Sequence, residues 1–349
     1  MRTRRKQPGR FTWGLVAAAV LSGCTDGSPA EPTSTLSPQA ALYLDAAVRI
    51  MESFSIKKNE IDWAEFRATT FEQAEAISAQ TTEDTYPMIG DALERIGDNH
   101  SFFQPASTPQ QLVGQFGQAL RDGPNTADPM SELIEAGVGY IDVPAFSGGG
   151  TEGNALALSY HQLIESVDTA DAVCRWVVDL RGNTGGNMWP MVAGIGPILG
   201  ADTIGMFVDP DSIVQTWFYA ADGTSGLDEG IIAAADPAYA LSSQPNVAVL
   251  HDSMTASSGE AVAIAFRGRP ASRSFGTETW GVSTANQGFS LSDGAVIFLT
   301  VSTMADREGT LYGQRVVPDE LVFGAKTGDR ATDAALDAAV TWLNAQSCA

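Results

Sequence analysis

The stretch Asn246–Arg267 constrains the fold more than any other part of the chain. It opens with a short apolar run, Val247–Leu250, which is typical of a buried strand. Residues 251–256 are small and polar and indicate a tight turn. Gly259–Arg267 then carries apolar residues at helical spacing, so a strand feeds directly into a helix that packs on a sheet. Ser257 lies where the turn becomes the helix.

Ser257 has two interpretations from its position alone. The first turn of a helix leaves N–H groups without partners, and the helix dipole favours negative charge there. A serine that attacks a carbonyl needs such donors for the oxyanion it creates. The same serine also fits a capping box with Glu260 three residues later. The local sequence leaves the chemical and the structural role open.

The first 24 residues predict a targeting segment. Basic residues precede an apolar run over 11–21, which is too short to span a bilayer. The run ends in Leu21-Ser22-Gly23-Cys24, which resembles the lipobox of bacterial lipoproteins. This resemblance implies that residues 1–23 are a lipoprotein signal peptide and that Cys24 carries the lipid anchor, with a plain secretory cleavage site as the alternative. We therefore expect a membrane-anchored protein of the cell envelope that faces the extracytoplasmic side.

The charge of the chain argues against two classes of partner. The 349 residues include 42 acidic and 20 basic ones, for a formal net charge of −22. Loss of residues 1–23, which hold five basic residues and no acidic one, would leave −27. Such a protein should repel nucleic acid and anionic lipid surfaces.

Composition divides the rest of the chain into three parts. Residues 24–37 are rich in Ser, Thr, Pro and Gly and predict a flexible tether. Residues 38–103 predict a helical N-terminal subdomain that ends in a loop carrying His100. Residues 104–349 form the predicted core, in which strands and helices alternate from Gly137 onward.

The predicted elements follow the apolar periodicity. Helices are expected over 71–80, 85–96, 156–167, 189–199 and 332–345, and strands over 138–143, 176–180, 203–208 and 213–219. A hairpin is expected from 289–292 and 295–302. Residues 104–132 suggest no further domain, and 221–245 suggest a long loop with a short Ala-rich helical piece.

A serine nucleophile needs a general base, and the chain has three histidines. His161 lies mid-helix and suggests packing, while His251 ends the strand that leads to Ser257. His100 lies in a polar loop whose small neighbours could orient an imidazole. The residues alone leave this choice open. No cluster of His, Cys, Asp and Glu suggests a metal, and we expect no cofactor.

Four blocks of sequence together resemble the S41 family of serine peptidases, the tail-specific or C-terminal processing proteases and their tricorn-like relatives. The likeness covers about residues 85–325, and the blocks are Asp179-Leu180-Arg181-Gly182-Asn183-Thr184-Gly185-Gly186, Thr255-Ala256-Ser257-Ser258-Gly259-Glu260, Gly276-Thr277-Glu278-Thr279-Trp280-Gly281 and Val317-Pro318-Asp319. The resemblance implies an α/β fold with a crotonase/ClpP-like core of ββα units. It also implies Ser257 as nucleophile and an oxyanion hole from the N–H of Ser258 and that of Gly185 or Gly186.

Two departures from the processing proteases narrow this resemblance. Val282 stands where they carry a catalytic lysine, and the chain between His100 and Val138 leaves no room for a PDZ domain. Both departures point to the tricorn-like branch, which uses serine and histidine. Asp98-Asn99-His100-Ser101 resembles the histidine block of that branch and implies His100 as the base. The branch also uses an acidic residue, for which we prefer Glu308 over Asp306 and Glu278.

The sequence thus predicts an exported, lipid-anchored serine peptidase that cleaves a peptide or protein substrate. A non-catalytic peptide- or ligand-binding lipoprotein on the same fold is one alternative, and an esterase is another. The sequence leaves open a disulfide between Cys174 and Cys348, the substrate sequence, and the choice between internal and tail-specific cleavage. It also leaves the oligomeric state open.

Overall fold

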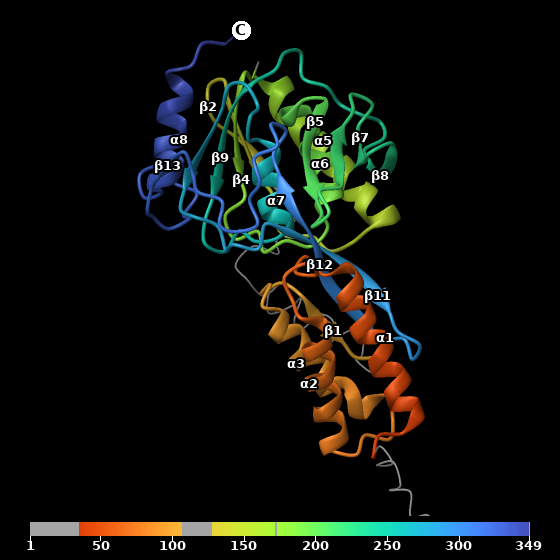
Figure 1. Cartoon of the computed structure of the whole chain (residues 1–349). Helices are drawn as coiled ribbons and strands as arrows, with labels where there is room; N and C mark the ends of the chain where they lie inside the picture. The colour runs from red at the N-terminus through yellow and green to blue at the C-terminus, as the bar shows by residue number, and fades with distance from the viewer. Residues whose placement is uncertain (1–34, 107–127, 172, 349) are drawn as a thin grey trace, which may run out of the picture.

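The computed structural model describes residues 35–106, 128–171 and 173–348. The predicted signal peptide, Cys24, most of the tether and residues 107–127 lie outside this part of the chain. Figure 1 shows an elongated molecule in which a narrow helical lobe extends from a larger α/β body. The first described helix starts at the far end of the lobe, and the C-terminus lies at the opposite end of the molecule.

The helical lobe forms around short helices with defined starts. Ser37 caps the first one by accepting the N–H of Ala40, and Pro38 occupies its first turn. Asp62 caps the second in the same way, so that helix begins before the predicted residue 71. The helices are α1 (Pro38–Phe54), α2 (Trp63–Ala76), the 3₁₀ helix η1 (Glu83–Thr85) and α3 (Tyr86–Ile96).

Six strands of the body form a mostly parallel sheet. They are β2 (Ser131–Glu135), β3 (Val138–Asp142), β4 (Arg175–Asp179), β9 (Asn246–His251), β10 (Ser272–Gly276) and β13 (Glu320–Leu321), in the order β13-β10-β9-β4-β3-β2. Only the edge strand β2 runs antiparallel to its neighbour. β3 is buried along its whole length, as expected for a strand covered on both faces.

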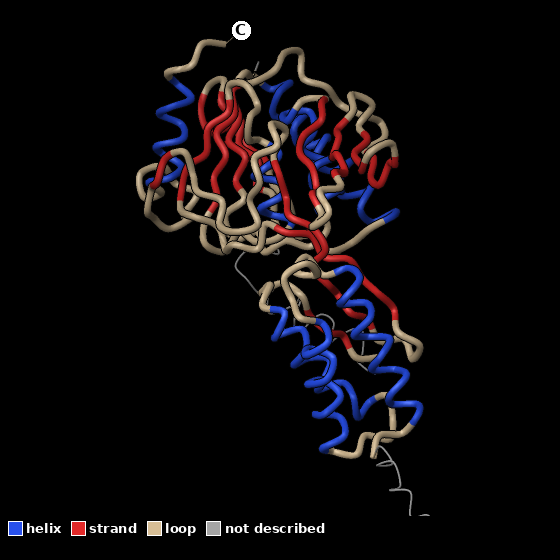
Figure 2. Tube along the Cα trace, viewed as in Figure 1, coloured by secondary structure: helices blue, strands red, loops and turns tan. Residues whose placement is uncertain are grey.

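Helices cover both faces of this sheet. One face packs on α5 (Gly150–Ala170), α6 (Met188–Leu199) and α7 (Ser258–Ala265), and the other on α8 (Ala334–Asn344). In Figures 1 and 2 the three helices stand between this sheet and a second one. The predicted α/β fold with a helical N-terminal region is confirmed.

The second sheet links the body to the lobe. Its strands are β1 (Phe102–Gln104), β5 (Asp202–Val208), β6 (Val214–Tyr219), β7 (Thr224–Leu227), β8 (Gly230–Ala234), β11 (Thr284–Ser290) and β12 (Val296–Ala305). The C-terminal end of β12 pairs with β5 in the body, its N-terminal end pairs with β1, and β11 pairs along it from Val296 to Thr303. Apolar residues of the β11–β12 region complete the core of the helical lobe, which therefore includes more than residues 38–103.

The prediction for residues 221–245 was wrong. The Ala- and Ile-rich segment forms β8, which pairs with β7 as an antiparallel hairpin instead of a helical piece. Packing against the rest of the fold determines the secondary structure of this segment. Ala233 is buried against α6, while Ile231 and Ile232 face solvent.

Cys174 and Cys348 form the disulfide that the sequence left open, with their Cα atoms 5.6 Å apart. The bond joins the start of β4 to the segment after α8 and therefore fastens α8 to the parallel sheet. Arg175 reinforces this junction by donating to the carbonyl of Gln346.

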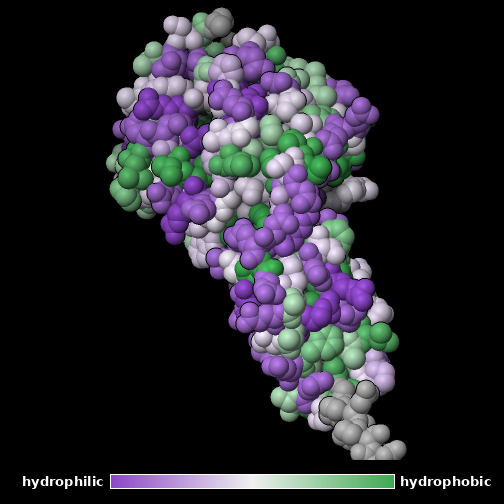
Figure 3. Space-filling model, viewed as in Figure 1, coloured by the Kyte–Doolittle hydropathy of each residue, from purple (hydrophilic) through white to green (hydrophobic). Residues whose placement is uncertain are grey.

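The surface on the viewed side is mostly hydrophilic or intermediate, with hydrophobic residues in scattered groups (Figure 3). Among the described residues, no helix has the length and apolar content needed to cross a membrane.

Candidate active site

Ser257 lies on a strained turn between β9 and α7. Its φ of 51° and ψ of −115° fall outside the regions that non-glycine residues favour, at a cost of about 1–3 kcal/mol. Its N–H donates to the carboxylate of Glu260, as the predicted capping box requires, at 2.9 Å. The side chain of Ser257 is partly exposed, whereas the helix behind it is buried. The turn therefore exposes this hydroxyl beyond the C-terminal end of strand β9.

Glu260 organises the wall beside the serine. Its carboxylate is fully buried and accepts four hydrogen bonds, from the N–H groups of Ser257, Gly281 and Val282 and from the hydroxyl of Thr279. Burial raises the pKa of this carboxyl, and the four donors oppose that shift. Glu260 therefore fixes the loop 279–282 to the same turn that carries Ser257.

The loop that carries His100 is held from both sides. Gly97 ends α3 with a left-handed φ of 73°, and Asp98 then accepts the N–H groups of His100 and Ser101. From β11, the side-chain amide of Asn286 donates to the carbonyl of His100 at 2.8 Å. Contacts to the helical lobe and to β11 therefore determine where the imidazole lies.

The imidazole of His100 meets Ser257 at the junction of lobe and body. Its Nε2 lies 3.1 Å from Ser257 Oγ, and its Nδ1 lies 2.7 Å from Thr284 Oγ1. When Nε2 accepts the serine proton, Nδ1 must carry the ring proton and donate it to Thr284. This is the hydrogen-bond chain of an activated serine, with a threonine hydroxyl in the third position.

The surroundings of His100 keep its ring neutral. Burial lowers the pKa of His100 to about 4, and the nearby carboxylate of Asp98 opposes that shift. At neutral pH the ring is therefore uncharged, with its one proton on Nδ1, and Nε2 can accept the serine proton.

The other two histidines are engaged elsewhere. His161 is buried; its Nε2 donates to the carbonyl of Ala193 and its Nδ1 accepts the N–H of Tyr239. His251 is also buried, and its Nδ1 donates to the carbonyl of Thr277. Both geometries indicate packing roles.

The Gly-rich loop closely approaches Ser257. A Cβ on Gly185 would lie 2.9 Å from the carbonyl oxygen of Ala256 and 3.0 Å from the Cβ of Ser257, so only glycine allows this approach. The prediction left open whether Gly185 or Gly186 supplies the loop's N–H to the oxyanion. The N–H of Gly185 already donates to Asn183 Oδ1 and is therefore engaged. Gly186 is solvent-exposed, and its N–H remains the loop's candidate beside that of Ser258 at the first position of α7.

The structure places none of the three predicted acidic residues at His100. Glu308 is exposed and lies beside Gly268, at the turn where β12 ends. Asp306 accepts the hydroxyl of Tyr312, and Glu278 faces Arg315 at 3.8 Å. A hydroxyl lies beside His100 Nδ1, where an acidic residue was predicted.

That hydroxyl belongs to Thr284, which sequence reasoning missed. It begins β11, two residues after Val282, the position at which the processing proteases carry lysine. The contact spans 184 residues of chain and depends on how β11 lies against the His100 loop. Its place three residues after the Gly276–Gly281 block was the available signal.

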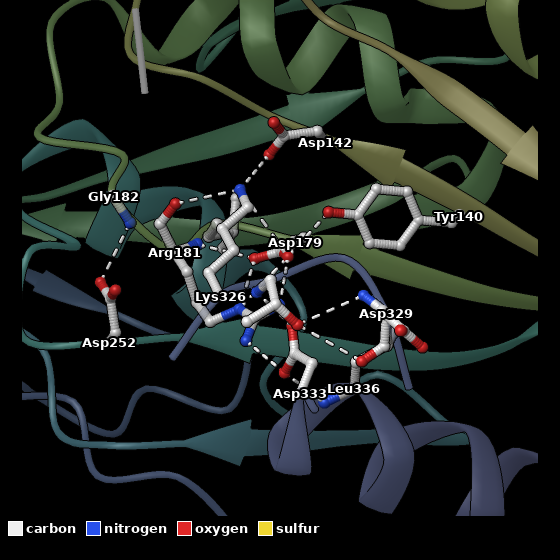
Figure 4. A network of polar contacts seen from close by, with 12 residues as sticks. Tyr140, Asp142, Asp179, Arg181, Gly182, Asp252, Lys326, Asp329, Asp333 and Leu336 are labelled. Carbon is white, nitrogen blue, oxygen red and sulfur yellow. Dashed lines mark hydrogen bonds and ion pairs between the residues drawn. The ribbon is translucent and has the colours of Figure 1, made fainter. Parts of the chain in front are cut away.

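A buried charge network holds the start of the Gly-rich loop (Figure 4). Arg181 pairs with Asp179 and Asp333, each at 2.7 Å, and all three side chains are buried. Lys326 approaches Asp142 at 2.7 Å, and Tyr140 donates its hydroxyl to Asp179. These charges are paired and hydrogen-bonded, as burial requires. The Asp179–Arg181 part of the first block therefore has a structural role.

The part of the chain that the structure describes contains no group of three or more His, Cys, Asp and Glu side chains arranged to hold a metal ion.

Comparisons with known proteins show the family and the fold. The nisin-resistance protein of Lactococcus lactis subsp. lactis is 26% identical over 315 residues, which cover 88% of each chain. The fold resembles a lipoprotein from Streptococcus agalactiae, with a TM-score of 0.69, 21% identity and coverage of 88% of this chain and 97% of that one. It also resembles the photosystem II D1 C-terminal processing protease, with a TM-score of 0.57, 15% identity and coverage of 81% and 93%. The family model of peptidase family S41 matches residues 137–322, just over half of the chain, and the protein belongs to this family.

Proposed function

We propose that this protein is an exported, lipid-anchored serine peptidase in which Ser257 is the nucleophile and His100 the general base. The observation that carries the proposal is the 3.1 Å contact between His100 Nε2 and Ser257 Oγ. Membership of family S41 supports hydrolysis of peptide bonds as the reaction class.

The reaction follows from the hydrogen-bond chain. Ser257 Oγ attacks the carbonyl carbon of the substrate while His100 Nε2 takes its proton, and Thr284 accepts from Nδ1 throughout. The N–H groups of Ser258 and Gly186 stabilise the oxyanion. His100 returns the proton to the leaving amine as the peptide bond breaks. A water molecule, deprotonated by the same ring, then hydrolyses the acyl-enzyme.

The comparisons support a peptide substrate outside the cytoplasm. The curated relative is named for resistance to nisin, and one structural neighbour is a lipoprotein. We propose that Cys24 carries the lipid and that the tether over residues 24–37 holds the protein at the membrane. The helical lobe then lies on the membrane side of the active site, since its far end is where the described chain begins.

Cleavage of a peptide library tests the activity. The wild type should release peptide fragments, and Ser257→Ala and His100→Ala should each lower the rate by three orders of magnitude or more. Ser159→Ala is a matched control, because this serine lies on α5 and only donates to the carbonyl of Leu156. Full activity of His100→Ala would remove that residue as base.

The two alternatives give different results in the same assay. An esterase cleaves activated esters but none of the library peptides. A non-catalytic binding lipoprotein cleaves neither substrate. For the anchor, Cys24→Ser should abolish incorporation of labelled palmitate in the producing cell.

A further inference from the structure

A hollow of about 430 Å³ lies on the body next to the loop 279–282. The mechanism above does not use it. Its lining residues come from two segments and are Glu278, Trp280, Gly281, Gln314, Arg315 and Val317.

The two segments run side by side and are held by buried contacts. Thr279 donates its N–H to the carbonyl of Val316 and accepts the N–H of Val316 on its hydroxyl. Thr279 and Val316 are both fully buried. Residues on either side of each one line the hollow, so this buried pair holds the two lining segments together.

This buried pair is connected to the turn that carries the nucleophile. The hydroxyl of Thr279 donates to one oxygen of the Glu260 carboxylate at 2.5 Å, and the other oxygen accepts the N–H of Ser257. The N–H of Trp280 donates to the carbonyl of Thr255, two residues before the nucleophile. The segment that lines one side of the hollow is therefore held directly to the turn that carries Ser257.

The side chains around the hollow are free to meet a ligand. Trp280 is 55% exposed and Val317 57%, which is high for large apolar side chains. Glu278 and Arg315 stand 3.8 Å apart, with 47% and 58% of their side chains exposed. Such a long, solvated ion pair contributes little, so a ligand can replace either partner at small cost.

We propose that this hollow is a substrate subsite that binds a basic side chain, lysine or arginine, next to the bond that is cleaved. The cation lies over the indole of Trp280 and pairs with Glu278, while Val317 contacts the aliphatic stem. The inference rests on the proposed peptidase function and adds the class of residue that the enzyme selects.

Charge favours a cation over an anion here. The formal net charge of −22 attracts basic peptides, and the electron-rich face of an indole attracts cations. The positive charge of Arg315 opposes this preference for a cation, so a change at Arg315 serves as a control for a change at Glu278. Removing its charge should strengthen the selection that removal of the Glu278 charge weakens.

Paired peptides that differ only in lysine or norleucine at one position test the proposal. The ratio of their kcat/KM values should exceed one at a single position and fall about threefold in Glu278→Gln. It should fall by a similar factor in Trp280→Leu and rise in Arg315→Gln. It should also decline between 0.05 and 0.5 M salt, because salt screens exposed charges. An unchanged ratio in Glu278→Gln and Trp280→Leu would overturn the proposal, as would selection of a glutamate-bearing peptide that depends on Arg315.

The test separates failure of the subsite from failure of the peptidase function. If no peptide is cleaved, the binding of fluorescent lysine and norleucine peptides to Ser257→Ala is measured instead. A lysine preference that Glu278→Gln removes supports the subsite without any catalysis. Equal affinity for both peptides overturns it.

Discussion

Replacement of Thr284 by valine removes the hydroxyl that faces His100 Nδ1 and little else. The two side chains have nearly the same shape, both are β-branched and suit the strand β11, and the site is 6% exposed. The substitution leaves the Nδ1–H of His100 without its 2.7 Å partner. We expect the imidazole to be less well oriented and the imidazolium that forms during the reaction to be less stable.

The magnitude follows from the cost of an unsatisfied buried donor, about 1–3 kcal/mol. At about 1.4 kcal/mol per factor of ten, kcat/KM should fall roughly 5- to 150-fold in Thr284→Val. The assay is kcat/KM for a cleaved peptide, with the rate of fluorophosphonate labelling as a second readout. Thr284→Ser keeps the hydroxyl and should retain most of the activity. If Thr284→Val and wild type agree within twofold by both readouts, Thr284 does not orient the base.

Burial lowers the pKa of His100 to about 4, so kcat/KM should stay flat from pH 8 to pH 5 and fall only as the ring is protonated near pH 4; a fall centred near pH 6.5 would show an unburied base. Glu308→Gln should leave kcat/KM within about twofold of wild type, because Glu308 lies at the turn beside Gly268. A hundredfold loss would show that Glu308 takes part in catalysis. Replacing Cys174 and Cys348 by alanine should cost about 2–5 kcal/mol of unfolding free energy in urea titrations, since the disulfide closes a loop of 174 residues; an unchanged midpoint would contradict a stabilising role.

The geometry at Ser257 could be predicted because its signal is local. A strand, a tight turn and a helix within Asn246–Arg267 define the geometry at Ser257, and the blocks before and after it gave the family. The Gly-rich loop could also be predicted from local sequence. Its close approach to Ser257 requires glycine at position 185. Only the structure shows that Asn183 Oδ1 accepts the N–H of Gly185.

The partner of His100 could not be predicted, because it depends on contacts between distant segments. Thr284 reaches the imidazole only after the β11–β12 hairpin has packed on the helical lobe. Glu308 was chosen by analogy with an acidic triad, and its turn composition gave no information about its distance from the ring. The β7–β8 hairpin was missed for a related reason, since its alanines favour a helix locally and pair as a strand only beside α6.

The central claim is that His100 activates Ser257, and labelling with a fluorophosphonate probe followed by peptide mapping tests it most directly. The wild-type protein at pH 7 should carry a single modified residue, Ser257. Labelling of the His100→Ala protein should be slower by at least a hundredfold while its thermal unfolding is unchanged. Modification of another serine, or equal labelling rates in the two proteins, would show that His100 does not activate Ser257.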